Sequence, residues 1–392
     1  MIRKQQEQCL NLAQMQMIIN SRIYWRLRAV WLRAMMGSLY LHLETAEHVF
    51  AYMMNAAHNL TEIMAPFFGR EVSEQFNQLL TQNSILLREL IEAQLSNDSE
   101  EISRIVNSLY QNNRERAALL NSINPFWNEV QWRNLMDTNL YFTLQQANAL
   151  ASGDYNNSVF LFDRLMAQAD LMGDYFAYGL YSYITVLPIT PALSLGTSRV
   201  RPTDLCVTYA MMNFLYYIQM FWFDQAIWMR IYSIARTLNP EYAESAYEKL
   251  RQLPIQYGNL LKTVFDDELV GELLVLIYEQ IDLMTNLITA QLDGNIDEIN
   301  RIVQRLYQNA DERVELIVSM NPFVNQNRWK NIYYSYLHST IEEITTYLAG
   351  EYDRSLKIYQ RLLEKSEHIN NEFTESLLKY LADRGAILSV IF

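Results

Sequence analysis

The sequence contains few residues of the types that build disulfides, metal sites and nucleophilic centres. Two cysteines and five histidines occur among 392 residues. Cys9 and Cys206 have neither a C-x-x-C spacing nor a neighbouring cysteine, so we expect small buried side chains rather than a redox pair. The chain also lacks G-x-S-x-G, Walker A, G-x-G-x-x-G and H-E-x-x-H motifs. We therefore expect no enzymatic activity and no cofactor.

Glycine and proline are also scarce, with 11 and 8 residues. Half of the residues are apolar and 19% are charged, which is typical of a globular protein rather than a disordered one. Leucine, methionine, alanine, glutamine and glutamate are common, and all of them favour helix. The composition predicts an all-α protein with long helices.

Cationic residues are outnumbered, with 31 Lys and Arg against 44 Asp and Glu and a net charge of −13. No local cluster of Lys and Arg offsets this excess, so nucleic acid and anionic membrane are not expected partners. The most apolar stretch, Tyr209–Phe223, is interrupted by Asn213 and Gln219 and is too short to span a bilayer. The first residues lack the apolar segment of a signal peptide. We expect a cytoplasmic protein without membrane insertion.

An internal repeat decides the domain organisation. Residues 93–126 return as residues 290–323 without gaps, and 19 of the 34 positions are identical. The same offset of 197 residues places Trp25 on Trp222 and Trp132 on Trp329. The chain is therefore predicted to be two tandem copies of one unit.

Each copy is expected to fold as a six-helix bundle. The first covers residues 1–183, the second covers residues 204–392, and residues 184–203 form a linker that contains three prolines. Capping signals mark the helix boundaries: a short capped turn precedes the fourth helix, Asn-Pro begins the fifth, and glycine ends the fifth. In the two copies these residues are Asn97-Asp98-Ser99 and Gly294-Asn295, Asn124-Pro125 and Asn321-Pro322, and Gly153 and Gly350.

Several short motifs carry a family resemblance. They are Tyr24-Trp25…Arg33, Phe221-Trp222…Arg230, Pro66-Phe67-Phe68-Gly69, Asn124-Pro125 and Gly153-Asp154-Tyr155. In these motifs the chain resembles an uncharacterised family of single-unit helical-bundle proteins from spore-forming bacteria, some of which carry the label acetylglutamate kinase. The resemblance covers both copies and implies the same bundle fold.

The resemblance also implies inward-facing histidines, which would suit a metal or an acid–base site. This chain departs from the family at every such place. The aligned residues are Arg28, Asn83, Asn139, Met166 and Gln168 in the first copy, and Gln225, Gln280, Tyr336, Leu363 and Lys365 in the second. We therefore do not expect the chemistry that those histidines would support.

Two Glu-x-x-Glu-His strings keep a metal hypothesis open. Helical bundles hold metals with carboxylate and imidazole groups one turn apart. The first string, Glu44-Glu47-His48, also fits the acidic first turn of a helix, which the helix dipole favours. The second string, Glu364-Glu367-His368, has no equivalent in the first copy, so we expect no metal at either place.

Polar residues persist at matching positions of both fourth helices. They form either pairs within the helix, such as Asn112 with Arg116, and ties to neighbouring helices, or a polar contact surface that is used twice. The candidate contact residues are Glu101, Arg104, Gln111, Asn112, Glu115, Arg116, Glu298, Arg301, Gln308, Asn309, Glu312 and Arg313.

The function expected from the sequence is that of a non-catalytic structural or interaction protein that forms a homo-oligomer. The apolar segments 184–195 and 386–392 are the expected contacts between molecules, because extended apolar segments must cover a hydrophobic surface. The alternative is a small-molecule or metal-binding bundle, including a diverged enzyme, whose pocket is assembled from residues that are distant in sequence.

Overall fold

A computed structural model describes residues 12–43, 45–186 and 207–384. Every long element within these ranges is a helix, so the all-α prediction is confirmed. The chain divides into two compact units between Cys206 and Val207. The two units are called unit 1 and unit 2 below, and each is described by itself.

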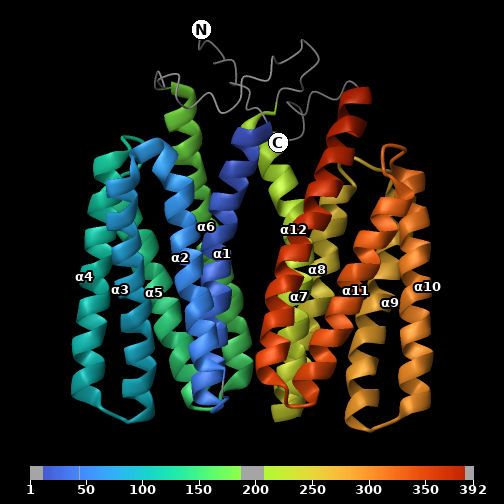
Figure 1. Cartoon of the computed structure of the whole chain (residues 1–392), viewed down its shortest axis with the longest axis horizontal. Helices are drawn as coiled ribbons and strands as arrows, with labels where there is room; N and C mark the ends of the chain where they lie inside the picture. The colour runs from blue at the N-terminus through green and yellow to red at the C-terminus, as the bar shows by residue number, and fades with distance from the viewer. Residues whose placement is uncertain (1–11, 44, 187–206, 385–392) are drawn as a thin grey trace. The chain divides into compact units, whose positions relative to one another are not determined.

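Unit 1 contains the first six helices of the described chain (Figure 1). They are α1 (Leu12–Tyr40), α2 (Ala46–Phe68), α3 (Arg70–Leu95), α4 (Ser99–Ile123), α5 (Glu129–Ala151) and α6 (Tyr155–Val186). Unit 2 contains α7 (Tyr209–Leu238), α8 (Pro240–Leu261), α9 (Asp267–Leu292), α10 (Ile296–Met320), α11 (Gln326–Leu348) and α12 (Tyr352–Asp383).

The offset of the sequence repeat reappears in the helix boundaries. Helices α3 to α6 begin at residues 70, 99, 129 and 155, and α9 to α12 begin at residues 267, 296, 326 and 352, each 197 residues later. Their last residues differ by the same number. Only the first two helices of each unit differ in length, by one residue each.

Within each unit, most helices pack against their neighbours in sequence, and the first helix also packs against the last. In unit 1 these first and last helices are α1 and α6, and in unit 2 they are α7 and α12. Side chains all around α7 are buried, as is usual for a helix that has no polar face. The bundle is therefore closed by helices from opposite ends of each unit.

The predicted start of the fourth helix and the predicted end of the fifth helix are confirmed in both units. The Asp98 carboxylate accepts a hydrogen bond from the Glu101 amide at 3.0 Å, and Asn295 caps α10 in the same way. Gly153 and Gly350 follow α5 and α11 with φ angles of 72° and 78°, a left-handed conformation that glycine adopts without strain.

The predicted start of the fifth helix is wrong in both units. Asn124 and Asn321 end the fourth helices, and their side chains accept hydrogen bonds from the Phe126 and Phe323 amides at 2.9 and 3.0 Å. This side-chain turn competes with helix formation, so α5 begins four residues later, after Asn128. The Asn128 side chain accepts from the Gln131 amide at 3.0 Å, and Asn325 caps α11 in the same way.

The linker predicted over residues 184–203 begins inside a helix, because α6 continues to Val186. The rest of this segment lies outside the described residues, as do Cys9, Cys206 and the C-terminal residues 386–392. Among the helices that the structure describes, α9 is long and apolar enough to cross a membrane. Half of its most apolar 18-residue stretch is buried inside the protein.

Candidate functional site

The twelve candidate contact residues separate into two groups. Eight lie at or near the surface, namely Glu101, Arg104, Gln111, Glu115, Glu298, Arg301, Gln308 and Glu312. Four are buried with no more than 4% of their surface exposed, namely Asn112, Arg116, Asn309 and Arg313. The contact-surface prediction is wrong for these four, because their side chains are enclosed by neighbouring helices of the same unit.

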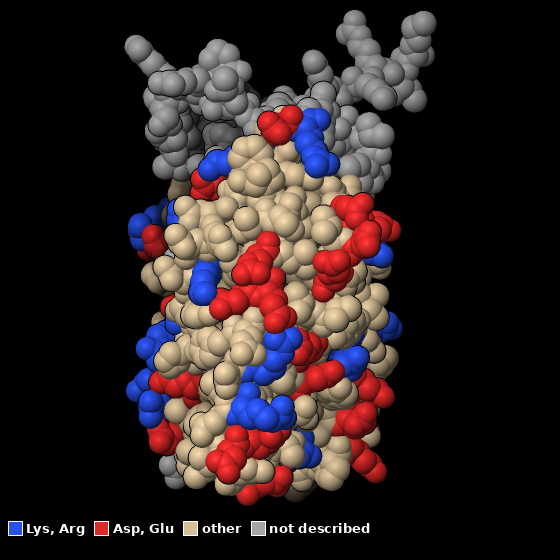
Figure 2. Space-filling view, turned by 90° about the vertical axis from the view of Figure 1, so that its right-hand side faces the viewer, with Lys and Arg blue, Asp and Glu red and all other residues tan. Residues whose placement is uncertain are grey.

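The surface group forms pairs along its own helices. Glu101 and Arg104 form an ion pair at 2.6 Å, and Gln111 donates a hydrogen bond to Glu115 at 2.8 Å. Figure 2 shows one face of unit 2, on which acidic and basic side chains alternate rather than form a patch of one sign. This arrangement is typical of a solvated helix surface, and by itself it provides no site.

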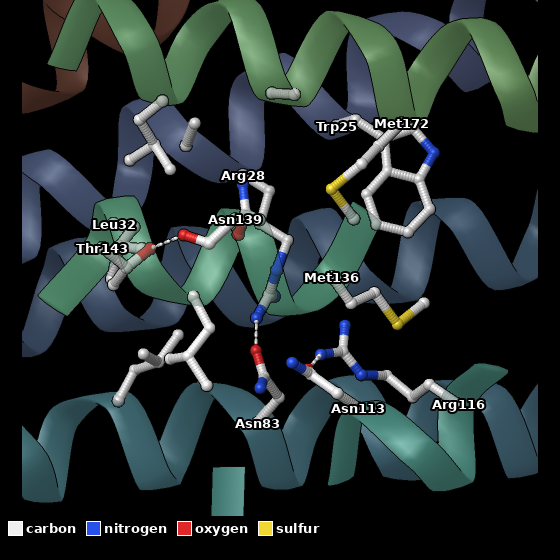
Figure 3. Close-up of a pocket in the computed structure, with 15 residues that line it drawn as sticks. Trp25, Arg28, Leu32, Asn83, Asn113, Arg116, Met136, Asn139, Thr143 and Met172 are labelled. Atoms are coloured by element: carbon white, nitrogen blue, oxygen red, sulfur yellow. Dashed lines mark hydrogen bonds between the residues drawn. The ribbon is translucent and has the colours of Figure 1, made fainter. Parts of the chain in front are cut away.

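A polar cavity lies inside unit 1, at the centre of the bundle. Its volume is about 30 Å³, and its polar lining includes Arg28 of α1, Asn83 of α3, and Asn113 and Arg116 of α4. Asn139 and Thr143 of α5 complete the polar lining, and Trp25, Met136 and Met172 lie on the apolar side. Figure 3 shows Arg28 and Arg116 reaching this space from different helices. We call this region the unit 1 cavity.

Both arginines of the unit 1 cavity bind neutral side chains. Arg28 donates to the Ser84 hydroxyl at 3.1 Å and to the Asn83 side-chain oxygen. Arg116 donates to the Asn113 side-chain oxygen, and its Nε atom has no acceptor. Two guanidinium groups therefore lie in the interior, and their hydrogen-bond acceptors are amide and hydroxyl oxygens.

Burial makes the charged form of Arg116 costly. It lowers the pKa of Arg116 to about 9, and the charge of Arg28 lowers it further. Burial also raises the pKa of the nearby Tyr24 hydroxyl, although Arg28 and Arg116 act against this shift. The unit 1 cavity is thus lined by two buried cationic groups.

Unit 2 fills the equivalent interior with larger side chains. At the 197-residue offset Tyr333 replaces Met136 and Tyr336 replaces Asn139. Arg313, the counterpart of Arg116, donates hydrogen bonds to the side-chain oxygens of Gln280 and Tyr333. Gln225 stands where Arg28 stands in unit 1. The buried arginine of unit 2 is therefore held by oxygen acceptors and has no second arginine beside it.

The positions that the family resemblance assigns to histidine fall partly in this interior. Arg28, Asn83 and Asn139 line the unit 1 cavity, whereas Gln168 donates to the backbone oxygen of Leu135. Asn113 and Arg116 were not predicted to lie inside the bundle. A signal was present, because Leu109, Arg116 and Leu120 have the spacing of one helix face.

The two Glu-x-x-Glu-His strings are not brought together into a site within the described ranges. Glu47 forms an ion pair with Arg88, and Glu364 accepts a hydrogen bond from Gln360 at 3.1 Å. No group of three or more metal-ligating side chains occurs in the part of the chain that the structure describes. Glu44 lies outside that part.

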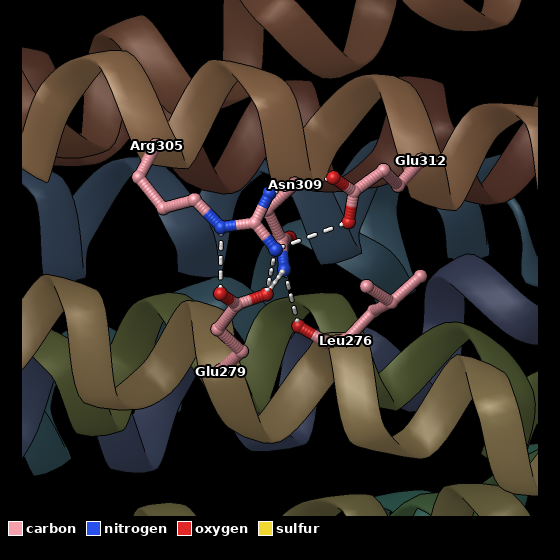
Figure 4. Close-up of polar contacts among 5 residues, drawn as sticks. All are labelled: Leu276, Glu279, Arg305, Asn309 and Glu312. Atoms are coloured by element: carbon pink, nitrogen blue, oxygen red, sulfur yellow. Dashed lines mark hydrogen bonds and ion pairs between the residues drawn. The ribbon is translucent and has the colours of Figure 1, made fainter.

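Buried asparagines tie the third and fourth helices of each unit together. Asn112 donates to the backbone oxygen of Leu79 at 2.9 Å, and Asn309 donates to that of Leu276 at 2.9 Å (Figure 4). The expected pair of Asn112 with Arg116 does not form. These two asparagines are retained because each supplies a hydrogen bond to the adjacent helix.

Unit 2 adds charge to this tie. Arg305 of α10 forms ion pairs at 2.6 Å with Glu279 of α9 and with Glu312 of its own helix (Figure 4). Hydrogen bonds from Arg305, and then from Asn309, lower the pKa of Glu279. Unit 1 has Gln82 and Ser108 in place of Glu279 and Arg305, so the charged tie belongs to unit 2 alone.

The outer side of α6 carries an exposed apolar stripe. Phe160, Leu171 and Tyr178 are 59%, 54% and 51% exposed, although each is a large apolar side chain. Together with Arg164, Ala167 and Asp174 they recur at alternating intervals of four and three residues. This is the spacing of a coiled-coil seam. We call these six residues the α6 face.

The two charged members of the α6 face also have contacts within unit 1. Asp174 forms an ion pair with the buried Arg22 of α1, which fixes its carboxylate. Arg164 lies over the rings of Phe142 and Phe160, with its central carbon 5.8 and 5.7 Å from the ring centres. Both groups are therefore held in place at the edge of an apolar surface.

Unit 2 has a different surface at the same place. Lys357, Glu364 and Glu375 of α12 stand where Phe160, Ala167 and Tyr178 stand on α6. These side chains are exposed and polar, as is usual for the outside of a bundle. The apolar stripe is therefore not a requirement of the fold.

Comparison with known proteins gives no relative: no family model, curated protein or solved structure matches the chain.

Proposed function

We propose that this chain is a non-catalytic interaction protein that self-associates, with the α6 face as the contact between two copies. The observation that supports this proposal is the order of residues on that face. Phe160 and Tyr178 lie at the two ends of the face, and Ala167 and Leu171 lie at its centre. Arg164 and Asp174 lie between the centre and the two ends. A helix with this order is complementary to a second copy of itself in the antiparallel direction.

The complementarity can be read from the residue numbers. If two α6 helices pair antiparallel about residue 169, Phe160 meets Tyr178 of the second copy, since 160 and 178 are equally distant from 169. Arg164 then meets Asp174, and Ala167 meets Leu171. Each contact occurs twice, as in any two-fold symmetric interface. Apolar groups thereby meet apolar groups, and opposite charges meet each other.

The size of the face sets the expected strength of association. From Phe160 to Tyr178 the helix spans about 27 Å at 1.5 Å per residue. One pair of helices buries less surface than the roughly 1,200–2,000 Å² of a standard stable interface. We therefore expect an association that depends on protein concentration. The apolar segments 184–195 and 386–392, mostly outside the described residues, are proposed as additional contacts.

The non-catalytic assignment is supported by the chemistry of the unit 1 cavity. Its polar lining consists of arginines, asparagines and a threonine, without a carboxylate, imidazole, thiol or amine that could act as base or nucleophile. The Thr143 hydroxyl donates to the backbone oxygen of Asn139 at 2.9 Å. The net charge of −13 supports the further proposal that neither nucleic acid nor anionic membrane is a partner. As the sequence led us to expect, we also propose a cytoplasmic protein.

The α12 sequence supplies the test of this proposal. The triple variant Phe160→Lys, Ala167→Glu and Tyr178→Glu gives α6 the residues that α12 carries at the same positions. Sedimentation equilibrium should show the native chain forming dimers or larger species with rising concentration. The variant should keep the 46.2 kDa mass of one chain. Circular dichroism should show unchanged helix content.

A control variant separates this face from general surface hydrophobicity. Val275 on α9 is 68% exposed, and Val275→Lys should leave the association unchanged. Arg164→Glu should weaken it, most of all at low salt, because glutamate would face Asp174 of the second copy. A native chain that remains a monomer at high concentration, or a triple variant that associates as strongly as the native chain, contradicts the proposal.

A further inference from the structure

We propose that the unit 1 cavity binds a small monovalent anion of halide size, held between Arg28 and Arg116. The inference goes beyond self-association, because it concerns the interior of one unit and does not depend on the α6 face. It follows from the charge of the lining, from a donor left without an acceptor, and from the size of the space.

The charge of the lining is uncompensated. Arg28 and Arg116 are only 9% and 4% exposed, and no carboxylate in the described part of the chain forms an ion pair with either. The carboxylate of Asp137 raises the pKa of Arg116, but it accepts its hydrogen bond from the Asn113 side chain, at 2.9 Å. Buried charges are ordinarily paired, because removing an ion from water is costly. An anion between the two guanidinium groups would supply the missing charge.

The lining also has a hydrogen-bond donor without an acceptor, the buried Nε–H group of Arg116. The Asn83 and Asn113 oxygens already accept hydrogen bonds from the arginines. What the site lacks is an acceptor with negative charge, which an anion provides to several donors at once.

The size of the space limits the class of anion. A cavity of about 30 Å³ has room for roughly two water molecules. Chloride, bromide and the carboxylate group of formate meet this limit. Phosphate and larger organic anions exceed it. We therefore assign the site to a small monovalent anion rather than to a phosphorylated metabolite.

The equivalent interior of unit 2 differs from the unit 1 cavity in its number of buried arginines. Gln225 replaces Arg28, so that one guanidinium group remains where unit 1 has two. That group, on Arg313, donates to Gln280 and Tyr333, and its carbon lies 5.3 Å from the ring centre of Trp222. Oxygen atoms and an aromatic face surround this single guanidinium group, although its Nε atom, like that of Arg116, has no acceptor. Arg28 is the residue that distinguishes the two interiors.

The test compares thermal unfolding in sodium bromide, sodium chloride and sodium gluconate at equal ionic strength. Gluconate controls for screening, because it is too large for the cavity. Bromide and chloride should raise the melting temperature by about 3–6 °C at roughly ten times their dissociation constant. Arg28→Gln, the residue of the second unit, should fold and lose this halide-specific rise. Arg313→Met in unit 2 should lower the melting temperature but keep the rise.

Diffraction from crystals grown in bromide gives an independent readout. An anomalous peak between Arg28 and Arg116 is the expected result, with no peak at the equivalent place near Arg313. Water alone in the cavity would overturn the proposal. So would a halide effect that is equal in the native chain and in Arg28→Gln, because binding elsewhere would then explain it. Self-association through the α6 face is measured separately and is unaffected by either outcome.

Discussion

The indole ring of Trp127 lies directly over Gly179 in unit 1. A Cβ atom at residue 179 would stand 2.6 Å from Cε2 of the indole, far inside van der Waals contact. The ring is fully buried, and its N–H group donates to the backbone oxygen of Tyr175 at 3.3 Å. Unit 2 has Val324 at the position of Trp127 and Ser376 at the position of Gly179. The large residue of the pair is therefore smaller in unit 2, and the small residue is larger.

Gly179→Ala should therefore destabilise the protein even though alanine favours helix. The new methyl group must displace a buried ring in a close-packed interior, which costs roughly 1–3 kcal/mol. Gly271→Ala in α9 is the matched control, because nothing lies within 4 Å of its added Cβ. That change should stabilise by about 0.5–1 kcal/mol. Urea unfolding of both variants measures the two signs, and a stabilised Gly179→Ala would contradict the packing.

Valine at position 127 together with serine at position 179, the residues of unit 2, should be tolerated better in unit 1 than serine at position 179 alone. Trp127→Val removes the ring that a serine side chain at 179 would strike. The free energies of unfolding of the two single variants and of the double variant with Gly179→Ser form a cycle. We expect a coupling of about 0.5–3 kcal/mol in favour of the double variant. Simple additivity would show that the two sites do not contact each other.

The two groups of polar residues on α4 should respond differently to truncation. Asn112→Ala removes a buried hydrogen bond to Leu79 and should cost about 1–2 kcal/mol. Gln111→Ala, at the next residue, removes an exposed pair and should stay within about 0.5 kcal/mol of the native value. Equal effects in urea unfolding would mean that the asparagine is not a structural tie.

The charged tie of unit 2 predicts a pH dependence. The pKa of Glu279 is lower in the folded protein than in the unfolded chain. Its stabilising contribution is therefore complete above the unfolded value near 4.5 and is lost as the pH falls through the folded value. Glu279→Gln, which introduces the unit 1 residue, should cost about 0.5–1 kcal/mol at pH 7. The difference from the native chain should shrink as the pH falls below about 4.5, and a difference that does not change with pH would rule out the ion pair as its origin.

The helix boundaries could be predicted where a single side chain decides them. Asp98, Asn295, Gly153 and Gly350 act on the adjacent backbone, so sequence alone locates them. Asn124 gave a wrong boundary because its side chain serves equally well in a turn and in a helix cap. The competing cap, Asn128, has a counterpart at Asn325, and this repetition would have favoured the later start.

The interior of unit 1 was harder to predict, because it depends on five helices at once. Arg116 has the polar character of a surface residue, and only its spacing from Leu109 and Leu120 places it inside. Its proximity to Arg28 requires that α1 and α4 face the same space, which no local pattern shows. The spacing of the α6 face could be recognised in the sequence. Whether that face is exposed depends on which side of the helix packs against the core.

The pairing of the first helix with the last also bears on synthesis. Arg22 and Arg26 of α1 are buried against Asp174 and Asp170 of α6, the latter pair at 2.5 Å. About 150 residues separate these partners. Because a ribosome adds roughly 5–20 residues per second, the carboxylates of α6 are synthesised some 7–30 seconds after the arginines of α1. During that interval the nascent chain presents an apolar helix whose two arginines lack their carboxylates. The N-terminal half of this chain should therefore need protection by chaperones until α6 has left the ribosome.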